Sequence, residues 1–384
     1  MPGKIHRSRF AGIVLVALLA AGPARAAEDL LIGQVSSQTS PVTAMNAKGL
    51  YAGFNVYLEH VNAQGGVNGR KVKLVNKDDQ LAAPKMIELT KAFASDKNVV
   101  ALAAYQNTAG ITALAKDNTV GQLGFALVAP FQGDKAIVGA PNFFPFRSGY
   151  PDEVAAMVKE GVFQQKKRVV VVYQSATFGP SMLKVAKDLA AREKLPIVAE
   201  VMIETAVNEK IDASIKQGAA AVANADPDCI FLLMGGRAAP LTVKAIRESS
   251  AADAHLYGMS ILPPGEVYKA AGDKARGIVI TQAVPFPFSA TLPVVSQYQK
   301  LMKQYAPNEP LSYTTLEGFI AAKITVEAIR RAGPNPTREK VLKAISNMGQ
   351  LDLGGVYVDY SPKGREGWGG VDLTIIGANG KLLR

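Results

Sequence analysis

Short apolar runs alternate with amphipathic segments along most of the chain. Residues 30–35 and 99–104 are apolar runs of strand length, whereas Leu50, Phe54 and Val61 fall on one face of a helix. The alternation resumes after residue 150, with strands expected at 168–173, 197–203, 229–234, 256–259 and 278–283 and helices between them. This spacing predicts parallel sheets with right-handed crossovers, and two such runs predict two doubly wound α/β lobes.

Three segments break this rhythm. Residues 141–151 and 283–288 are rich in proline and aromatic residues, and residues 351–355 contain two adjacent glycines. Proline fixes φ and disfavours helix, which suits a short extended linker. We therefore expect three chain crossings between the lobes. The predicted boundaries are residues 27–146 with 285–350 for the first lobe, and 147–284 with 351–384 for the second.

Two further apolar runs lie near the C-terminus, at 356–360 and 371–376. The residues between them are rich in glycine and include the single tryptophan, Trp368. Two runs joined by such a loop predict a β-hairpin, which the boundaries above place in the second lobe.

The N-terminus has the pattern of a secretory signal. Basic residues precede an apolar run at 10–21 that is too short to span a bilayer as a helix, and Ala24-Arg25-Ala26 fits cleavage by signal peptidase. We expect residues 1–26 to be removed and the chain to be released into the periplasm. The segment holds no cysteine, so no lipid anchor is expected.

Length and composition agree with two cores. Removing 26 of the 384 residues leaves 358, more than one ordinary core holds. The chain is 48% hydrophobic and 20% charged, which is ordinary for a globular protein and argues against disorder.

The net charge is basic but dispersed. Of the formal +11, the signal contributes +4, which leaves +7. No basic run is longer than residues 166–168, so we expect a solvated surface and no nucleic-acid partner. The excess would suit an anionic solute or an anionic membrane face.

Cysteine and histidine are too few for a metal site. The one cysteine, Cys229, lies in a run typical of a buried strand, so we expect a core thiol and no disulfide. His60 and His255 have no partner at metal-ligand spacing. The sequence therefore predicts no metal and no cofactor.

Catalytic motifs are missing from the sequence. It has no GxGxxG that opens a helix, no P-loop and no GxSxG elbow. The paired acids Asp78 and Asp79 have no histidine or metal partner and suit a helix cap better. We therefore expect no catalytic residues and do not expect an enzyme.

Several segments resemble the branched-chain amino-acid-type (type I) family of periplasmic binding proteins. Residues 61–74, with Gly65-Gly66 between a helix and a strand, are similar to that family's signature. Phe146-Arg147-Ser148 is similar to its first crossing, and Phe178-Gly179 and Gly235-Gly236 are similar to its cleft loops. The resemblance covers essentially the whole chain after the signal.

The resemblance implies two lobes that close around a small solute, a Venus flytrap, with three crossing segments between them. It implies a monomeric solute receptor of an ABC importer, in amino-acid or related transport, with the membrane permease as its partner. A ligand-sensing subunit for a receptor kinase or chemoreceptor has the same binding physics, and the sequence leaves that alternative open.

Doubly wound sheets place ligands beyond the carboxyl ends of their strands, where helix N-termini begin. We therefore expect the site in the loops that follow the strands of both lobes. The candidate solute-binding residues are Gln38, Gln106, Asn107, Thr108, Phe131, Gln132, Tyr150, Phe178, Arg237, Ser260 and Phe286.

The resemblance also implies roles for these residues. Family members that bind amino acids hold the carboxylate with hydroxyl groups and backbone amides of the first lobe. Gln106, Asn107 and Thr108 would serve here, with backbone amides of Phe131 and Gln132. Those members hold the ammonium with an acid of the second lobe.

That acid is replaced by Ser260 in this chain, and Arg237 offers a bidentate clamp for an anion. We therefore expect a carboxylate solute without an α-amino group. An aromatic body could stack on Phe131, Phe178 or Phe286. Glu204 or Glu266 could still pair with an ammonium, which would restore an amino-acid solute.

Overall fold

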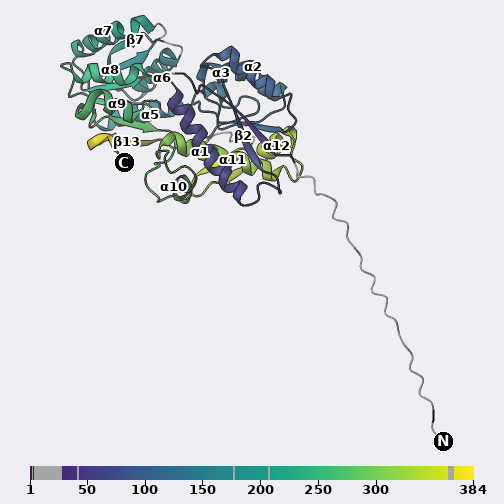
Figure 1. The fold of residues 1–384 in the computed structure, drawn as a ribbon. Helices are drawn as coiled ribbons and strands as arrows, with labels where there is room; N and C mark the ends of the chain where they lie inside the picture. Colours follow the sequence, from purple (N-terminus) through teal and green to yellow (C-terminus); the bar gives the residue numbers. More distant parts are fainter. Residues whose placement is uncertain (2, 4–27, 41–42, 176–177, 206–207, 362–366) are drawn as a thin grey trace.

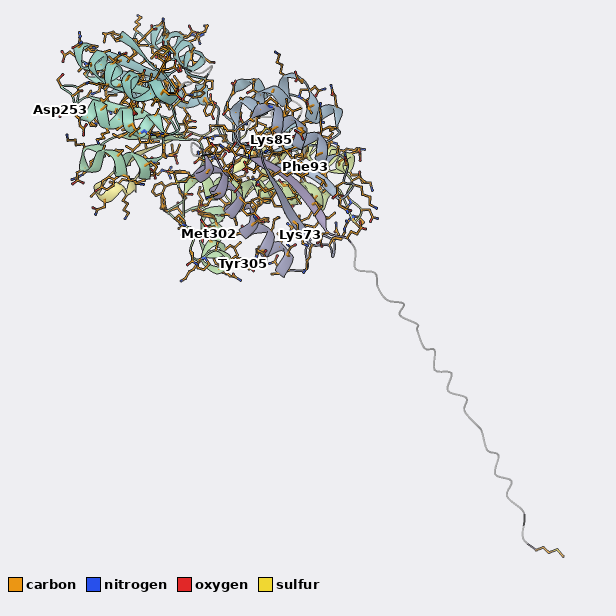
Figure 2. All side chains as sticks on the ribbon, turned by 45° about the horizontal axis from the view of Figure 1, so that its top comes forward. Lys73, Lys85, Phe93, Asp253, Met302 and Tyr305 are labelled. Atoms are coloured by element: carbon orange, nitrogen blue, oxygen red, sulfur yellow. The ribbon has the colours of Figure 1, made fainter. Side chains whose placement is uncertain are left out.

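The computed structural model describes residues 1, 3, 28–40, 43–175, 178–205, 208–361 and 367–384. The predicted signal, residues 1–26, falls almost wholly outside this part. The described chain forms two lobes that lie side by side (Figure 1). Phe93 and Met302 lie in the first lobe, and Asp253 lies on the outer side of the second (Figure 2).

The first lobe is built on a five-stranded sheet in the order β2-β1-β3-β4-β5, with every pair parallel. The strands are β1 (Leu30–Ser36), β2 (Val72–Asp78), β3 (Val99–Ala103), β4 (Leu127–Val128) and β5 (Phe143–Phe144). The helices are α1 (Ala44–Ala63), α2 (Ala83–Phe93), α3 (Thr108–Lys116), α4 (Thr119–Gln122), α10 (Pro293–Tyr305), α11 (Tyr313–Arg331) and α12 (Arg338–Ser346). A two-stranded ribbon, β11 (Gln350–Asp352) with β12 (Tyr357–Asp359), completes the lobe.

The second lobe is built on a seven-stranded sheet in the order β14-β13-β10-β9-β8-β6-β7. The strands are β6 (Val169–Gln174), β7 (Ile197–Ile203), β8 (Cys229–Leu233), β9 (His255–Gly258), β10 (Val279–Gln282), β13 (Asp372–Ile376) and β14 (Leu382–Leu383). The last two strands are antiparallel. The helices are α5 (Tyr150–Phe163), α6 (Phe178–Arg192), α7 (Ile211–Asn224), α8 (Ala238–Arg247) and α9 (Pro264–Ala271).

The central strands show why the sequence folds this way. All five residues of β3 and of β8 are buried, as are the four consecutive valines of β6. Parallel strands covered by helices on both faces need such unbroken apolar runs. The predicted fold class, two doubly wound lobes, is confirmed. Cys229 is buried in β8, and burial raises the pKa of its thiol to about 12.

Hydrogen bonds tie the three crossings together. The Ser148 amide in the first crossing donates to the Ala283 carbonyl in the second at 3.3 Å. The Trp368 amide in the third donates to the Phe146 carbonyl at 2.7 Å, and the Ser148 hydroxyl donates to the Gly370 carbonyl. The three crossing segments are therefore held to one another by hydrogen bonds and do not join the lobes independently.

The third crossing lies later in the chain than residue 351. Leu353, Val356, Val358 and Tyr360 all pack in the core of the first lobe. The predicted hairpin is wrong, because β12 pairs with β11 whereas β13 pairs with β10. Asp352 explains the difference, since its side chain accepts the amides of Gly354 and Gly355 at 2.8 Å and turns the chain back on itself. Residues 362–366 lie outside the described part.

Glycines let α1 and α11 pack backbone to backbone. A Cβ added at Gly53 would lie 1.8 Å from the Thr315 carbonyl oxygen, and one at Gly318 would lie 2.2 Å from that of Leu50. The helices lie side by side and carry the start of α11 to the boundary between the lobes (Figure 1). In the described chain, no helix is both long and apolar enough to cross a membrane.

Gly53→Ala should lower the free energy of unfolding by about 2 kcal/mol or more, because the backbones would have to separate. The matched control is Gly265→Ala in α9, where an added Cβ meets nothing within 4 Å. This control should change stability by no more than about 1 kcal/mol. Urea unfolding of both variants checks the difference, and equal effects would contradict the proposed close packing.

Candidate functional site

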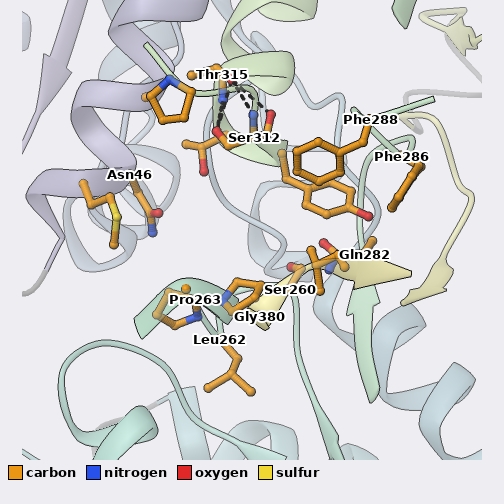
Figure 3. Close-up of a pocket in the computed structure, with 18 of the residues that line it drawn as sticks. Asn46, Ser260, Leu262, Pro263, Gln282, Phe286, Phe288, Ser312, Thr315 and Gly380 are labelled. Atoms are coloured by element: carbon orange, nitrogen blue, oxygen red, sulfur yellow. Dashed lines mark hydrogen bonds between the residues drawn. The ribbon is translucent and has the colours of Figure 1, made fainter. Parts of the chain in front are cut away.

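A cavity of about 1130 Å³ lies between the two lobes. The first lobe contributes the starts of α1 and α11, including Asn46 and Ser312, and the second contributes residues 260–266 after β9. Phe286 and Phe288 close one side from the second crossing (Figure 3). A molecule bound here would contact both lobes and the segment that joins them.

The aromatic side of this cavity is a packed cluster. The rings of Phe286 and Phe288 lie 5.3 Å apart, and the ring of Tyr313 lies 6.4 and 6.3 Å from them. All three contacts are edge-to-face, the arrangement that aromatic rings prefer. The cluster gives the cavity a broad apolar wall that a flat apolar solute could contact.

The eleven predicted residues do not all meet in this cavity. Only Ser260 and Phe286 are among the residues that line it. The others fall into a polar group at the strand tips of the first lobe, a cluster around Arg147, and Arg237 on its own. Asn46, Phe288 and Tyr313 line the cavity but were not predicted.

The polar group is organised by Asp79, which is fully buried after β2. Its carboxylate accepts the Ser37 hydroxyl at 2.6 Å and the Asn107 amide at 2.8 Å. The Gln106 side-chain oxygen accepts the Ser37 backbone amide at 3.2 Å. Gln38 remains within its own loop, where its amide donates to the Ser36 hydroxyl at 3.3 Å.

Asn107 acts as the N-cap of α3, because its side-chain oxygen accepts the Gly110 amide at 3.2 Å. The side chains of Gln106 and Asn107 are therefore engaged inside the first lobe. Thr108, by contrast, is exposed in the first turn of α3. The first amides of a helix lack partners within it and favour an anion. This turn can therefore receive a carboxylate.

The backbone amides of Phe131 and Gln132 are already used. They donate to the carbonyls of Tyr105 and Pro130, each at 2.8 Å. The expectation that these amides point at a solute is therefore wrong. The Gln132 side chain is buried and donates to the Thr108 carbonyl at 3.3 Å.

Arg237 follows Gly235-Gly236 and is exposed where α8 begins. The Gly235 amide donates to the Gln174 side chain at 3.1 Å, which fixes the loop before it. Arg237 itself is exposed to solvent at the N-cap position of α8. Its contact with an anion stays a prediction.

Arg147, in the first crossing, connects four of the predicted residues. Its guanidinium lies 4.4 Å from the centre of the Phe131 ring and 5.6 Å from that of Tyr150, which packs edge-to-face on Phe178 at 5.0 Å. Its Nη2 donates to the Ser260 hydroxyl at 2.6 Å. Phe131, Tyr150 and Ser260 therefore share one buried cation, and Phe178 is joined to this cluster through Tyr150.

Two buried glutamates face this arginine, one from each lobe. Glu153 of α5 lies 3.9 Å from Nη2, and Glu317 of α11 lies 3.9 Å from Nε. Glu153 also accepts the Ser260 amide at 2.7 Å, the Ser260 hydroxyl at 2.9 Å and the Thr281 hydroxyl at 2.6 Å. Glu153 thus fixes the position of Ser260, which lines the cavity.

Burial governs the protonation of these acids. It raises the pKa of Glu317 to about 7, although the charge of Arg147 opposes the shift. Burial also raises the pKa of Glu153, against Arg147 and the bonds from Thr281 and Ser260. Glu317, beside the charged guanidinium, is therefore close to a protonation change at neutral pH.

Arg147 was not among the predicted site residues. It is 4% exposed, yet Nε and Nη1 have no hydrogen-bond acceptor among the described residues. A buried donor without an acceptor costs about 1–3 kcal/mol. The available signal was a lone arginine beside Phe146 in a segment expected to cross between lobes. Among the described residues, no cluster of three or more His, Cys, Asp or Glu side chains could hold a metal ion.

Comparisons with known proteins agree on one family. The sequence model of a family described as "Periplasmic binding protein" matches residues 30–379. A Leu/Ile/Val-binding protein homolog from Brucella abortus is 23% identical over 368 residues, 94% of this chain and 93% of that protein.

Two solved structures share the fold. A substrate-binding periplasmic protein from Ralstonia solanacearum is 28% identical with a TM-score of 0.84, covering 92% of this chain and 99% of its own. A solute-binding protein of an ABC transporter from R. palustris, in complex with benzoate, is 19% identical with a TM-score of 0.76. That match covers 92% of this chain and 95% of the other.

Glu317→Gln should change how stability depends on pH. The pKa of Glu317 is about 7 in the folded chain, against 4.5 for an ordinary glutamate, so the folded state binds the proton more tightly. This contribution is complete below about pH 4.5 and is lost as the pH rises through 7. Relative to wild type, the variant should gain up to about 3 kcal/mol between pH 5 and pH 8.

Urea unfolding at both pH values measures this gain. Glu327→Gln is the matched control, because it makes the same change on the same helix, in a surface pair with Arg331. The control should show no comparable gain. A difference between Glu317→Gln and wild type that stays constant with pH would contradict the assignment.

Proposed function

Because the chain belongs to the periplasmic binding protein family, we propose that it is the extracytoplasmic solute receptor of an ABC importer. Membership of the family implies a solute-binding receptor in the periplasm rather than an enzyme. We also propose that a membrane permease is its partner and that residues 1–26 are the export signal.

The observation that carries this proposal is the cavity between the lobes, lined from both sides and from the second crossing. A solute that contacts both lobes binds the closed arrangement better than the open one. It therefore shifts the equilibrium toward closure by that difference in affinity. A permease can then distinguish the loaded receptor by its closed outline.

We propose a carboxylate without an α-amino group as the solute. An ammonium buried in the cavity would need an acid as its partner, and one without it would be costly. Both oxygens of Glu153, the acid nearest to Ser260, accept hydrogen bonds, and Arg147 offsets its charge. Glu204 accepts the Ser175 hydroxyl at 2.6 Å.

Glu266 supports the second candidate, an amino-acid solute. It lines the cavity, and its only ion pair in the described chain is with the exposed Lys269 at 4.0 Å. It could therefore turn toward an ammonium. The names of the relatives do not decide, because one refers to Leu/Ile/Val and another to benzoate.

The carboxylate of the solute has more candidate partners than an ammonium would have. Thr108 and the first turn of α3 offer amides and a hydroxyl to an anion, and the exposed Arg237 can approach from the second lobe. The aromatic wall of Phe286, Phe288 and Tyr313 suits a flat apolar body. Thr108 and Arg237 do not line the cavity in this structure, so the proposed aromatic carboxylate requires closure of the lobes to bring them toward this wall.

Isothermal titration should show binding of benzoate or 4-hydroxybenzoate and no comparable binding of leucine or glutamate. An aromatic acid present at about a hundred times its Kd should also stabilise the protein by about 2.7 kcal/mol. Tight leucine binding that Glu266→Gln abolishes would instead support the amino-acid solute. Binding of none of the four would contradict the proposed solute classes.

Phe286→Ala should weaken binding of the aromatic acid about tenfold, which corresponds to about 1.4 kcal/mol of lost ring contact. Phe163→Ala is the control, because Phe163 is 80% exposed at the end of α5 and does not line the cavity. The control should bind as wild type does. Equal affinity for both variants would remove Phe286 from the site.

A further inference from the structure

The buried guanidinium of Arg147 makes contacts with both lobes at once. On the first-lobe side it lies over the ring of Phe131 and near Glu317 of α11. On the second-lobe side it meets Ser260 and Glu153. Arg147 itself belongs to the first crossing, so it lies where the two lobes pivot.

Through Ser260, this cluster reaches the solute cavity. Ser260 lines the cavity, its hydroxyl accepts from Arg147 and donates to Glu153, and its amide also donates to Glu153. Any shift of Arg147 relative to Glu153 must therefore move a residue that lines the cavity.

The ion pairs of the cluster are incomplete in this structure. Both carboxylates lie 3.9 Å from the guanidinium, whereas a charge-assisted hydrogen bond spans about 2.7–2.9 Å. Nε faces Glu317 at that distance and has no hydrogen-bond acceptor among the described side chains. An approach of about 1 Å between α11 and the first crossing would complete this bond.

We propose that Arg147 is a positioning residue for solute binding, and that Glu317 is the first-lobe acid whose hydrogen bond to Arg147 forms when the lobes close. This inference rests on the proposed function, because it assumes a solute that drives closure. Arg147 then aligns Ser260 with Phe131, and Glu317 links that alignment to the angle between the lobes.

The charge of Glu317 makes the contact sensitive to pH. The groups that face it are Arg147 from the first crossing and, from α5, Glu153 and Tyr150. Burial raises the pKa of Glu317 to about 7, so the acid is neutral in mildly acidic solution and ionised in mildly basic solution. Only the ionised acid attracts Arg147 strongly, so the closed form should gain as the pH rises through 7.

Titration of wild type, Glu317→Gln and Glu327→Gln with benzoate, which stays ionised from about pH 5.5 upward, tests the proposal. Wild type should bind about tenfold more tightly at about pH 8.5 than at about pH 5.5, a usual size for coupled equilibria. Glu317→Gln should bind as wild type does at the lower pH and show no gain. Glu327→Gln, on the same helix, should follow wild type.

Titrations in two buffers of different ionisation enthalpy count the protons exchanged. Near pH 7, wild type and Glu327→Gln should release protons on binding, and Glu317→Gln should not. A purely structural role for Glu317 would leave that release unchanged. A pH slope or proton release retained in Glu317→Gln would overturn the proposal. Arg147→Lys keeps the positive charge but loses the planar guanidinium with its several N–H donors. This variant should weaken binding at both pH values.

A measurement without solute separates this inference from the choice of solute. Small-angle scattering should show a smaller radius of gyration for unliganded wild type at about pH 8.5 than at about pH 5.5, and no such change for Glu317→Gln. If benzoate does not bind wild type, the solute class is wrong and scattering alone decides. Identical scattering by both proteins at both pH values would overturn the role of Glu317.

Discussion

The fold depends on one buried cation at the point where its two halves meet. A guanidinium removed from water is tolerated only with counter-charges and acceptors close by. Arg147 has Glu153 and Glu317 for this purpose, and they belong to helices of different lobes. Each lobe therefore contributes one counter-charge to Arg147. A movement of either lobe changes the distance between Arg147 and one of these carboxylates.

The rest of the boundary is arranged around that requirement. Hydrogen bonds among the three crossings fix the backbone on either side of Arg147, at Phe146 and Ser148. The second crossing also carries Phe286 into the cavity. One of the segments that join the lobes therefore also lines the cavity. A molecule in the cavity would contact a segment on which the angle between the lobes depends.

The sequence was most informative where structure is local. The valine run of β6 and the helical face of Leu50, Phe54 and Val61 could be recognised because strand and helix periods are short-range properties. The crossings near residues 147 and 285 could be predicted because proline and aromatic residues interrupt that pattern. The fold class followed from the order of these elements.

Long-range relations could not be obtained in this way. Glu317 and Arg147 are far apart in the chain, so no local pattern pairs them. The partner of β13 is decided by the space beside β10, and the Asp352 turn that keeps β12 in the first lobe looks like any Gly-rich loop. The rule that ligands lie beyond the carboxyl ends of strands was enough to select Thr108 and Ser260 as candidates. The cavity residues Asn46 and Tyr313 lie at the starts of α1 and α11, and only the packing of these two helices brings them together.

The position of Cys229 has a practical consequence. It is the single cysteine of the chain, it is buried in β8, and its thiol stays protonated far above neutral pH. A thiolate is the reactive form, so this sulfur will scarcely react with maleimides. A cysteine introduced at the cleft rim could therefore carry a fluorophore at a single position without removal of the native thiol. The receptor is thus ready to be made into a reagentless optical sensor for its own solute.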